Sequence, residues 1–256
     1  MCSTPDRHGR QPLGGGAGVM RTKEARVREV LQDPTVERTP GIVTIRVWEL
    51  PVRVLHWTVV GAVLVLAGTG YYIGDPYILV GSEPGFVMGL IRAIHLAAAW
   101  VFSVAIICRI IWSFIGNRWS RWDQLVPVHR ERRVWLWKTL GYYLFLRKEP
   151  PPAAGHNPLA GVTYLVVFVM FVVQIITGLA LAALANPQGV LWSTTSWVFG
   201  LFAIQTVRLI HHLIMWLTIG FVIHHVYSAV LVDIEEKSGL VSSILTGYKR
   251  LPIDRL

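Results

Sequence analysis

The sequence predicts an all-α integral membrane protein: a four-helix transmembrane bundle with both termini in the cytoplasm, plus short interfacial helices. Of its 256 residues, 53% are hydrophobic and only 15% are charged, whereas soluble domains carry about 25% charged residues. The mean hydropathy is +0.49. Eleven Trp residues agree with this class, because Trp is enriched where a protein meets the lipid–water interface.

Four apolar runs are long enough for a helix to cross the hydrocarbon core, which takes about 20 residues. They lie at 52–74, 91–115, 161–185 and 207–232. A weaker run at 190–206 predicts an interfacial loop or short helix that Trp192 and Trp197 anchor.

These runs divide the chain into three expected parts. Residues 1–45 form a mobile cytoplasmic tail with a short helix at 21–32, residues 46–235 the four-span domain, and residues 236–256 a cytoplasmic tail. The loop at 75–90 contains no Lys or Arg, whereas residues 116–160 contain eight. Because cytoplasmic loops carry the excess of Lys and Arg, we expect the central loop and both termini in the cytoplasm, and the chain in the inner membrane.

Charge and cysteine content exclude several functions. The net charge of +9 would suit a nucleic-acid binder only if the basic residues gathered on a soluble face, and here they lie between apolar runs. Two cysteines are too few to ligate an iron–sulfur cluster. The absence of a Cys-x-x-Cys-His motif excludes covalent attachment of a c-type haem.

Histidines inside the spans are the strongest functional signal. Ionisable side chains at membrane depth are costly and mark a functional site by default. His211 and His225 are fourteen residues apart, so they return to within about 40° of one helix face and stand about 21 Å apart along the axis. The histidines within the spans are His56, His95, His211, His212, His224 and His225.

Depth selects the partners of His211 and His225. With the expected orientation, His95 meets His211 towards the outer face, and His56 meets His225 towards the cytoplasm. Two imidazoles per level are too few for a structural zinc site but fit the two axial positions of a haem iron. For any single histidine, a hydrogen bond to a neighbouring helix is the alternative.

Eight segments, in order along the chain, resemble the cytochrome b subunit of membrane-bound uptake nickel–iron hydrogenases. The four-helix, two-haem arrangement is more distantly similar to the gamma subunit of respiratory formate dehydrogenases. The segments are VWELPVRVLHW (47–57), GYYIG (70–74), FVMGLIRAIHLAAAWVF (86–102), RIIWSFIGNRWSR (109–121), GHNPLA (155–160), HHLIMW (211–216), HHVYSAVLVDI (224–234) and VSSILTGYKR (241–250).

The resemblance implies two b haems, a periplasmic hydrogenase of small and large subunits as electron donor, and membrane quinone as acceptor. It implies no hydrogen-splitting chemistry in this chain. His224 stands where the family motif has an aliphatic residue, which leaves open whether His224 or His225 binds iron. The implied axial ligands are His56, His95, His211 and His225.

Further residues are candidates for holding haem. We expect Arg53, Arg92 and Arg208 to pair with haem propionates through charge-assisted hydrogen bonds. The alternative is an interfacial anchor for Arg53 and snorkelling to lipid headgroups for the other two. Gly68 would leave room for a flat macrocycle, or serve close helix packing.

His156 and Asn157, directly before the third span, are candidates for a quinone pocket in which the histidine hands over protons. Helix capping by Asn157 ahead of Pro158 is the alternative.

Together these features predict a membrane-anchoring dihaem cytochrome b that carries electrons from a periplasmic nickel–iron hydrogenase to quinone. One alternative is a gamma-type subunit of a formate dehydrogenase or another periplasmic oxidoreductase. A second is a non-redox four-span anchor or transporter whose histidines relay protons, which predicts a colourless protein.

Overall fold

The computed structural model of the chain describes residues 37–39, 41–76, 84–117, 119–122, 125–126, 130–143, 146 and 158–252. The helix predicted at 21–32 and the quinone candidates His156 and Asn157 lie outside these residues. The chain divides into two compact units, of which the second runs from Arg46 to Lys249.

Three short strands form an antiparallel hairpin with one added strand. β1 (Glu37–Thr39) pairs with β2 (Ile42–Arg46), with Thr39 opposite Ile42. Gly41 lies in the connecting turn at φ 81°, a conformation that glycine adopts without steric cost. β3 (Tyr248–Pro252) completes the sheet in the order β1-β2-β3.

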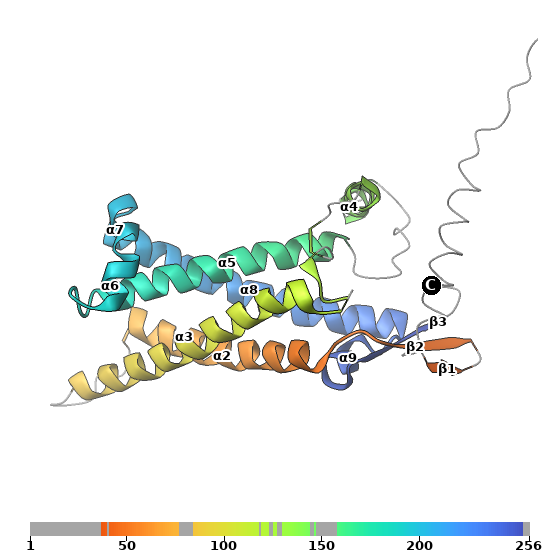
Figure 1. Cartoon of the computed structure of the whole chain (residues 1–256), viewed down its shortest axis with the longest axis horizontal. Coiled ribbons are helices and arrows are strands. Elements are labelled where there is room, and N and C mark those ends of the chain that lie inside the picture. The colour runs from red at the N-terminus through yellow and green to blue at the C-terminus, as the bar shows by residue number, and fades with distance from the viewer. Residues whose placement is uncertain are drawn as a thin grey trace, which may run out of the picture. The chain divides into compact units, whose positions relative to one another are not determined.

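Four long helices dominate the second unit (Figure 1). All four are long and apolar enough to cross a membrane, and they confirm the four predicted spans. α2, α3 and α5 each have a proline in the first turn, where the missing N–H costs no hydrogen bond. The helices are α2 (Leu50–Gly74), α3 (Pro84–Ile115), α5 (Pro158–Ala183) and α8 (Ile204–Glu236).

The outer faces of these helices are apolar. In the most apolar window of each span, only 11–22% of the residues are buried, and Leu64, Ile107 and Leu217 are all more than half exposed. A soluble protein rarely exposes such continuous apolar surface, whereas helices that satisfy their own backbone hydrogen bonds are stable in lipid. The chain is therefore a multi-pass membrane protein.

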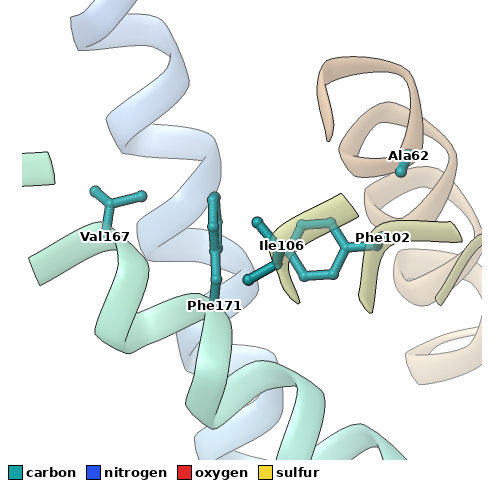
Figure 2. Close-up of a cluster of buried hydrophobic side chains, with 5 residues drawn as sticks. All are labelled: Ala62, Phe102, Ile106, Val167 and Phe171. Atoms are coloured by element: carbon teal, nitrogen blue, oxygen red, sulfur yellow. The ribbon is translucent and has the colours of Figure 1, made fainter. Parts of the chain in front are cut away.

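A buried apolar cluster holds the middle of the bundle together. Phe102 and Ile106 of α3 lie between Ala62 of α2 and the pair Val167 and Phe171 of α5 (Figure 2). The Phe102 and Phe171 rings meet edge to face, with their centroids 5.1 Å apart, which is a favoured aromatic geometry.

Short helices close one end of the bundle, which we call the α6–α7 end. α6 (Val190–Thr195) and α7 (Trp197–Leu201) lie in the segment 190–206, where the sequence predicts a loop or short helix, so the structure has two short helices there. Trp192 stacks on Phe199 with the ring centroids 5.8 Å apart. Val198 is buried against Ala180 of α5 and Val207 of α8.

The opposite end, which we call the α9 end, is joined by polar contacts. The Glu49 carboxylate accepts hydrogen bonds from the Trp112 indole at 3.0 Å and from the Asn117 backbone N–H at 2.9 Å. α9 (Leu240–Thr246) is held to the start of α2 by a hydrogen bond from Trp48 Nε1 to Ser243 Oγ at 3.1 Å. α4 (Arg130–Tyr143) is a shorter helix between α3 and α5 in the sequence.

Candidate functional site

The histidines of the four long helices gather at two levels. At the level nearer the α6–α7 end, His95 lies near the start of α3, and His211 and His212 lie near the start of α8. At the level nearer the α9 end, His56 of α2 lies beside His225 of α8. The buried apolar cluster lies between these levels along α2 and α3.

His56 and His225 have the geometry of an imidazole pair around one metal ion. Their ring centroids are 6.4 Å apart and the rings are inclined by 55°. A metal–imidazole nitrogen bond is about 2 Å long, so two rings on opposite sides of one ion have centroids roughly 6 Å apart. The Nδ1 atom of His56 is buried and has no hydrogen-bond partner within the described part of the chain.

Aromatic rings hold His225 in this position. Phe221 stacks on the imidazole with 5.5 Å between centroids and 18° between planes, and Tyr164 of α5 meets it edge to face at 6.0 Å. The neighbouring His224 is exposed, and its Nε2 contacts Ser228 Oγ of the same helix at 3.4 Å. Of the two adjacent histidines, His225 therefore faces the bundle.

His95 is contacted by two consecutive residues of α2. Its Nδ1 atom lies 2.8 Å from Thr69 Oγ1. A Cβ atom at Gly70 would stand 3.3 Å from Cε1 of the same ring, so a larger residue there would require the ring to move by a few tenths of an ångström.

His211 is contacted in the same way from α5. Its Nδ1 atom lies 2.9 Å from Thr177 Oγ1, and a Cβ atom at Gly178 would stand 3.0 Å from its Cε1. Its Nε2 lies 3.3 Å from the amide nitrogen of Gln174. His95, His211 and His212 lie within electrostatic range of one another.

This donor set suits haem iron better than a bare metal ion. The described residues contain no group of three or more His, Cys, Asp or Glu side chains placed to hold an ion, whereas a structural zinc site uses four such ligands. Haem iron needs two axial ligands from the protein. The paired imidazoles, and the buried nitrogen of His56 that lacks a partner, fit that requirement.

Three arginines each precede a histidine by three residues, a spacing that puts both side chains on one helix face. Each arginine lies on the side of its histidine that is nearer the end of the bundle. Arg92 and Arg208 are exposed. The pairs are Arg53–His56, Arg92–His95 and Arg208–His211.

Arg53 differs from the other two arginines because it is half-buried. Its Nη1 donates a hydrogen bond to the Leu245 carbonyl oxygen, while its Nε is buried without a partner among the described residues. Gly68 contacts neither histidine level: it is exposed, and nothing lies within 4 Å of the position that a Cβ atom would take there.

A groove of about 330 Å³ lies between α3 and α5 near the α9 end. Arg109 reaches into its wall, with its guanidinium 5.8 Å from the Phe168 ring centroid and Nη2 3.3 Å from the Ser120 carbonyl oxygen. Its Nη1 is buried and lacks a hydrogen-bond partner in the described structure. Apolar side chains such as Phe114 and Val172 form most of the remaining lining.

Sequence reasoning missed three of the residues that contact His95 and His211, namely Thr69, Thr177 and Gly178. The signal available for them is the dipeptide Thr-Gly, which occurs in the first span at 69–70 and in the third at 177–178. Gln174, one turn before Gly178, is a further polar residue in an apolar span.

A multi-pass helical protein with paired histidines at two depths belongs to the class of transmembrane b-type cytochromes. The model of the family described as prokaryotic cytochrome b561 matches residues 47–247, and the chain belongs to this family. A b-type cytochrome contains haem b, and its role is electron transfer.

Curated relatives match over most of their length. The chain is 39% identical over 232 residues to a protein of Bradyrhizobium diazoefficiens named "Probable Ni/Fe-hydrogenase B-type cytochrome subunit", covering 86% of this chain and 92% of the relative. It is 38% identical over 222 residues to a protein of Escherichia coli K12 named "Probable Ni/Fe-hydrogenase 1 B-type cytochrome subunit", covering 83% of this chain and 94% of the relative. A similarly named protein of Cupriavidus necator is 38% identical over 214 residues, which cover 79% of this chain and 86% of the relative.

Proposed function

We propose that this chain is the membrane-anchoring cytochrome b subunit of a nickel–iron hydrogenase, that it holds two b haems, and that it connects a periplasmic hydrogenase heterodimer with the quinone pool. The observation that carries the proposal is the pair of histidine levels on a chain whose relatives are named hydrogenase cytochrome subunits. Haem b supplies a one-electron iron couple at each level.

Four histidines would hold the two irons, one pair at each level. His56 and His225 form the pair at the α9 end, and His95 and His211 the pair at the α6–α7 end. The buried apolar cluster around Phe102 and Phe171 lies between the two levels.

Arginines would hold the propionates. Arg53 serves the level at the α9 end, and Arg92 and Arg208 serve the other level. Each lies on the side of its histidine nearer the end of the bundle, where charged carboxylates remain closest to water and can form charge-assisted hydrogen bonds.

The basic residues support an inner-membrane orientation with both termini in the cytoplasm. Residues 116–160 contain eight Lys and Arg, and residues 186–206 contain no charged side chain. By the positive-inside rule, the α6–α7 end would then lie on the periplasmic side. The hydrogenase small and large subunits would dock at that end. The relatives' names favour this partner over a formate dehydrogenase.

Haem quantitation on the purified chain tests the proposal. We expect a reduced-minus-oxidised spectrum of a b-type cytochrome, with about two haems per chain because each level offers one pair of axial ligands. In the complex with its hydrogenase subunits, dihydrogen is expected to reduce both. A well-folded chain with one haem or none would contradict the proposal, and a colourless preparation would favour a proton relay or a plain anchor.

The groove beside Arg109 is the proposed position of the quinone ring. A quinone is an apolar ring with carbonyl acceptors. It suits an apolar groove in which Arg109 offers Nη1, a buried donor without a partner among the described residues. Phe168 in its wall is one helical turn from Tyr164, which contacts His225. His156 and Asn157, directly before α5 in the sequence, remain candidates for lining a quinone pocket, in which His156 would hand over protons.

Replacing Arg109 by Gln tests this position in the intact hydrogenase complex. A hydrogen bond to a charged group contributes about 1.5–3 kcal/mol, so we expect KM for a soluble quinone analogue to rise roughly tenfold or more. Haem content and haem reduction by dihydrogen should not change. The control is Arg121→Gln at an exposed position, and loss of a haem instead of a change in KM would assign Arg109 to a propionate.

A further inference from the structure

Thr69 and Thr177 form the same contact with a histidine on two different helix pairs. Thr69 of α2 reaches His95 of α3, and Thr177 of α5 reaches His211 of α8, at Oγ1–Nδ1 distances of 2.8 and 2.9 Å. Each threonine is followed by a glycine that lies against Cε1 of the same imidazole ring. The repeated element is therefore a Thr-Gly step, in which the hydroxyl holds one ring atom and the glycine leaves space for the next.

The second hydrogen bond of each hydroxyl fixes which atom donates. Thr69 Oγ1 lies 2.7 Å from the Val65 carbonyl oxygen, and Thr177 Oγ1 lies 2.8 Å from that of Val173. A carbonyl oxygen can only accept and a hydroxyl has one proton, so each hydroxyl donates to its carbonyl. The hydroxyl oxygen must then accept from the histidine, which carries its proton on Nδ1.

This assignment leaves the lone pair of both histidines on Nε2, because a neutral imidazole has one donor and one acceptor nitrogen. At His211, the amide nitrogen of Gln174 lies 3.3 Å from Nε2. An amide nitrogen only donates, so this contact fits a ring that accepts at Nε2 and carries its proton on Nδ1.

The level at the α9 end lacks this arrangement. His56 Nδ1 is buried with no hydrogen-bond partner among the described residues, and His225 is positioned by the rings of Phe221 and Tyr164. A hydrogen bond from the second ring nitrogen to an acceptor fixes the orientation of a metal-binding histidine and raises its basicity. Here the acceptor is a threonine hydroxyl oxygen. It accepts more strongly because the same hydroxyl donates its proton to a backbone carbonyl oxygen.

We propose that Thr69 and Thr177 are positioning residues for the iron at the His95–His211 level: they hold both imidazoles in the tautomer whose lone pair is on Nε2, and they lower the reduction potential at that level alone. The inference rests on the proposed function, because it requires iron at that level. More basic imidazoles stabilise the oxidised iron, so removing the hydroxyls should raise its potential.

Replacing each threonine by Val removes the hydroxyl and keeps the shape, whereas replacement by Ser keeps the hydroxyl. In the purified holo-chain, a spectroscopic redox titration of T69V and T177V should show one of two haem potentials raised. We expect the reduction equilibrium to change by about tenfold, equivalent to about 59 mV for one electron. T69S and T177S should restore the potential of the unaltered chain.

Thr163→Val is the matched control. Thr163 is also on α5, and its hydroxyl bonds the Leu159 carbonyl oxygen four residues earlier at 3.0 Å, just as Thr177 bonds Val173. Unchanged potentials in T69V and T177V, or Ser variants that behave like the Val variants, would overturn the inference. Absence of haem in the unaltered chain would instead overturn the proposed function, so the two failures are distinguishable.

Discussion

Replacing His95 or His211 by Ala should remove one of the two haems, and replacing His56 or His225 should remove the other. The members of each pair lie at the same level of the bundle, and an iron that loses one axial imidazole is no longer held from both sides. We expect haem content to fall from about two to about one per chain in every single variant. Haem quantitation with redox titration of the remaining haem provides the measurement.

The chain supplies matched controls in its two adjacent histidine pairs. His212 lies next to His211 but its ring faces Gly74 of α2, where a Cβ atom would stand 2.8 Å from Cε1. His224 lies next to His225 and is exposed. His212→Ala and His224→Ala should each keep both haems. Loss of a haem in H224A but not in H225A would assign the iron to His224 and contradict the proposed ligand set.

Quinone reduction by the complex should fail in all four ligand variants, because each haem is the sole redox group proposed at its level. H212A and H224A should retain it. A ligand variant that keeps about two haems per chain would contradict the proposed axial positions.

The large elements of the fold follow from the sequence because they depend on local patterns. An apolar run of sufficient length predicts a span wherever it occurs, and all four spans are present within a few residues of their predicted limits. The arrangement of the histidines at two levels could also be predicted from the sequence, because a spacing of fourteen residues returns His225 to nearly the same helix face as His211.

The contacts around the histidines could not be predicted, because they depend on the rotation of one helix against another. Gly68 and Gly70 illustrate this: residues two apart on a helix point about 160° apart, and the structure places Gly70, not Gly68, against His95. The presence of a threonine in an apolar span needs no further partner, because its hydroxyl can donate a hydrogen bond to the carbonyl oxygen four residues earlier. Its additional bond to a histidine emerges only when α2 meets α3, and α5 meets α8.

Replacing Gly178 by Ala should selectively impair the His95–His211 level. An alanine in a helix interior is ordinarily more stable than glycine by about 0.5–1 kcal/mol, so the baseline expectation is a gain in stability. At Gly178, however, the new Cβ atom would stand 3.0 Å from His211 Cε1, which forces the ring to move. That movement strains the Thr177 Oγ1–His211 Nδ1 hydrogen bond at 2.9 Å.

The expected result is haem affinity lowered by about tenfold or more at this level, since altering the outer contacts of a metal ligand typically costs that much. Haem retention during dilution, followed for each haem by its spectrum, is the measurement. Gly70→Ala should act in the same direction but more weakly, because its Cβ atom would stand 3.3 Å from His95 Cε1.

Gly89→Ala is the reference for this series, since it lies on α3 with nothing within 4 Å of the added atom. The order of effects should therefore follow the three distances, with Gly178 most affected, Gly70 less and Gly89 unaffected. Equal retention of both haems in G178A and G89A would mean that His211 can shift without cost. The close contact between the Thr-Gly step and the histidine ring would then not contribute to holding the iron.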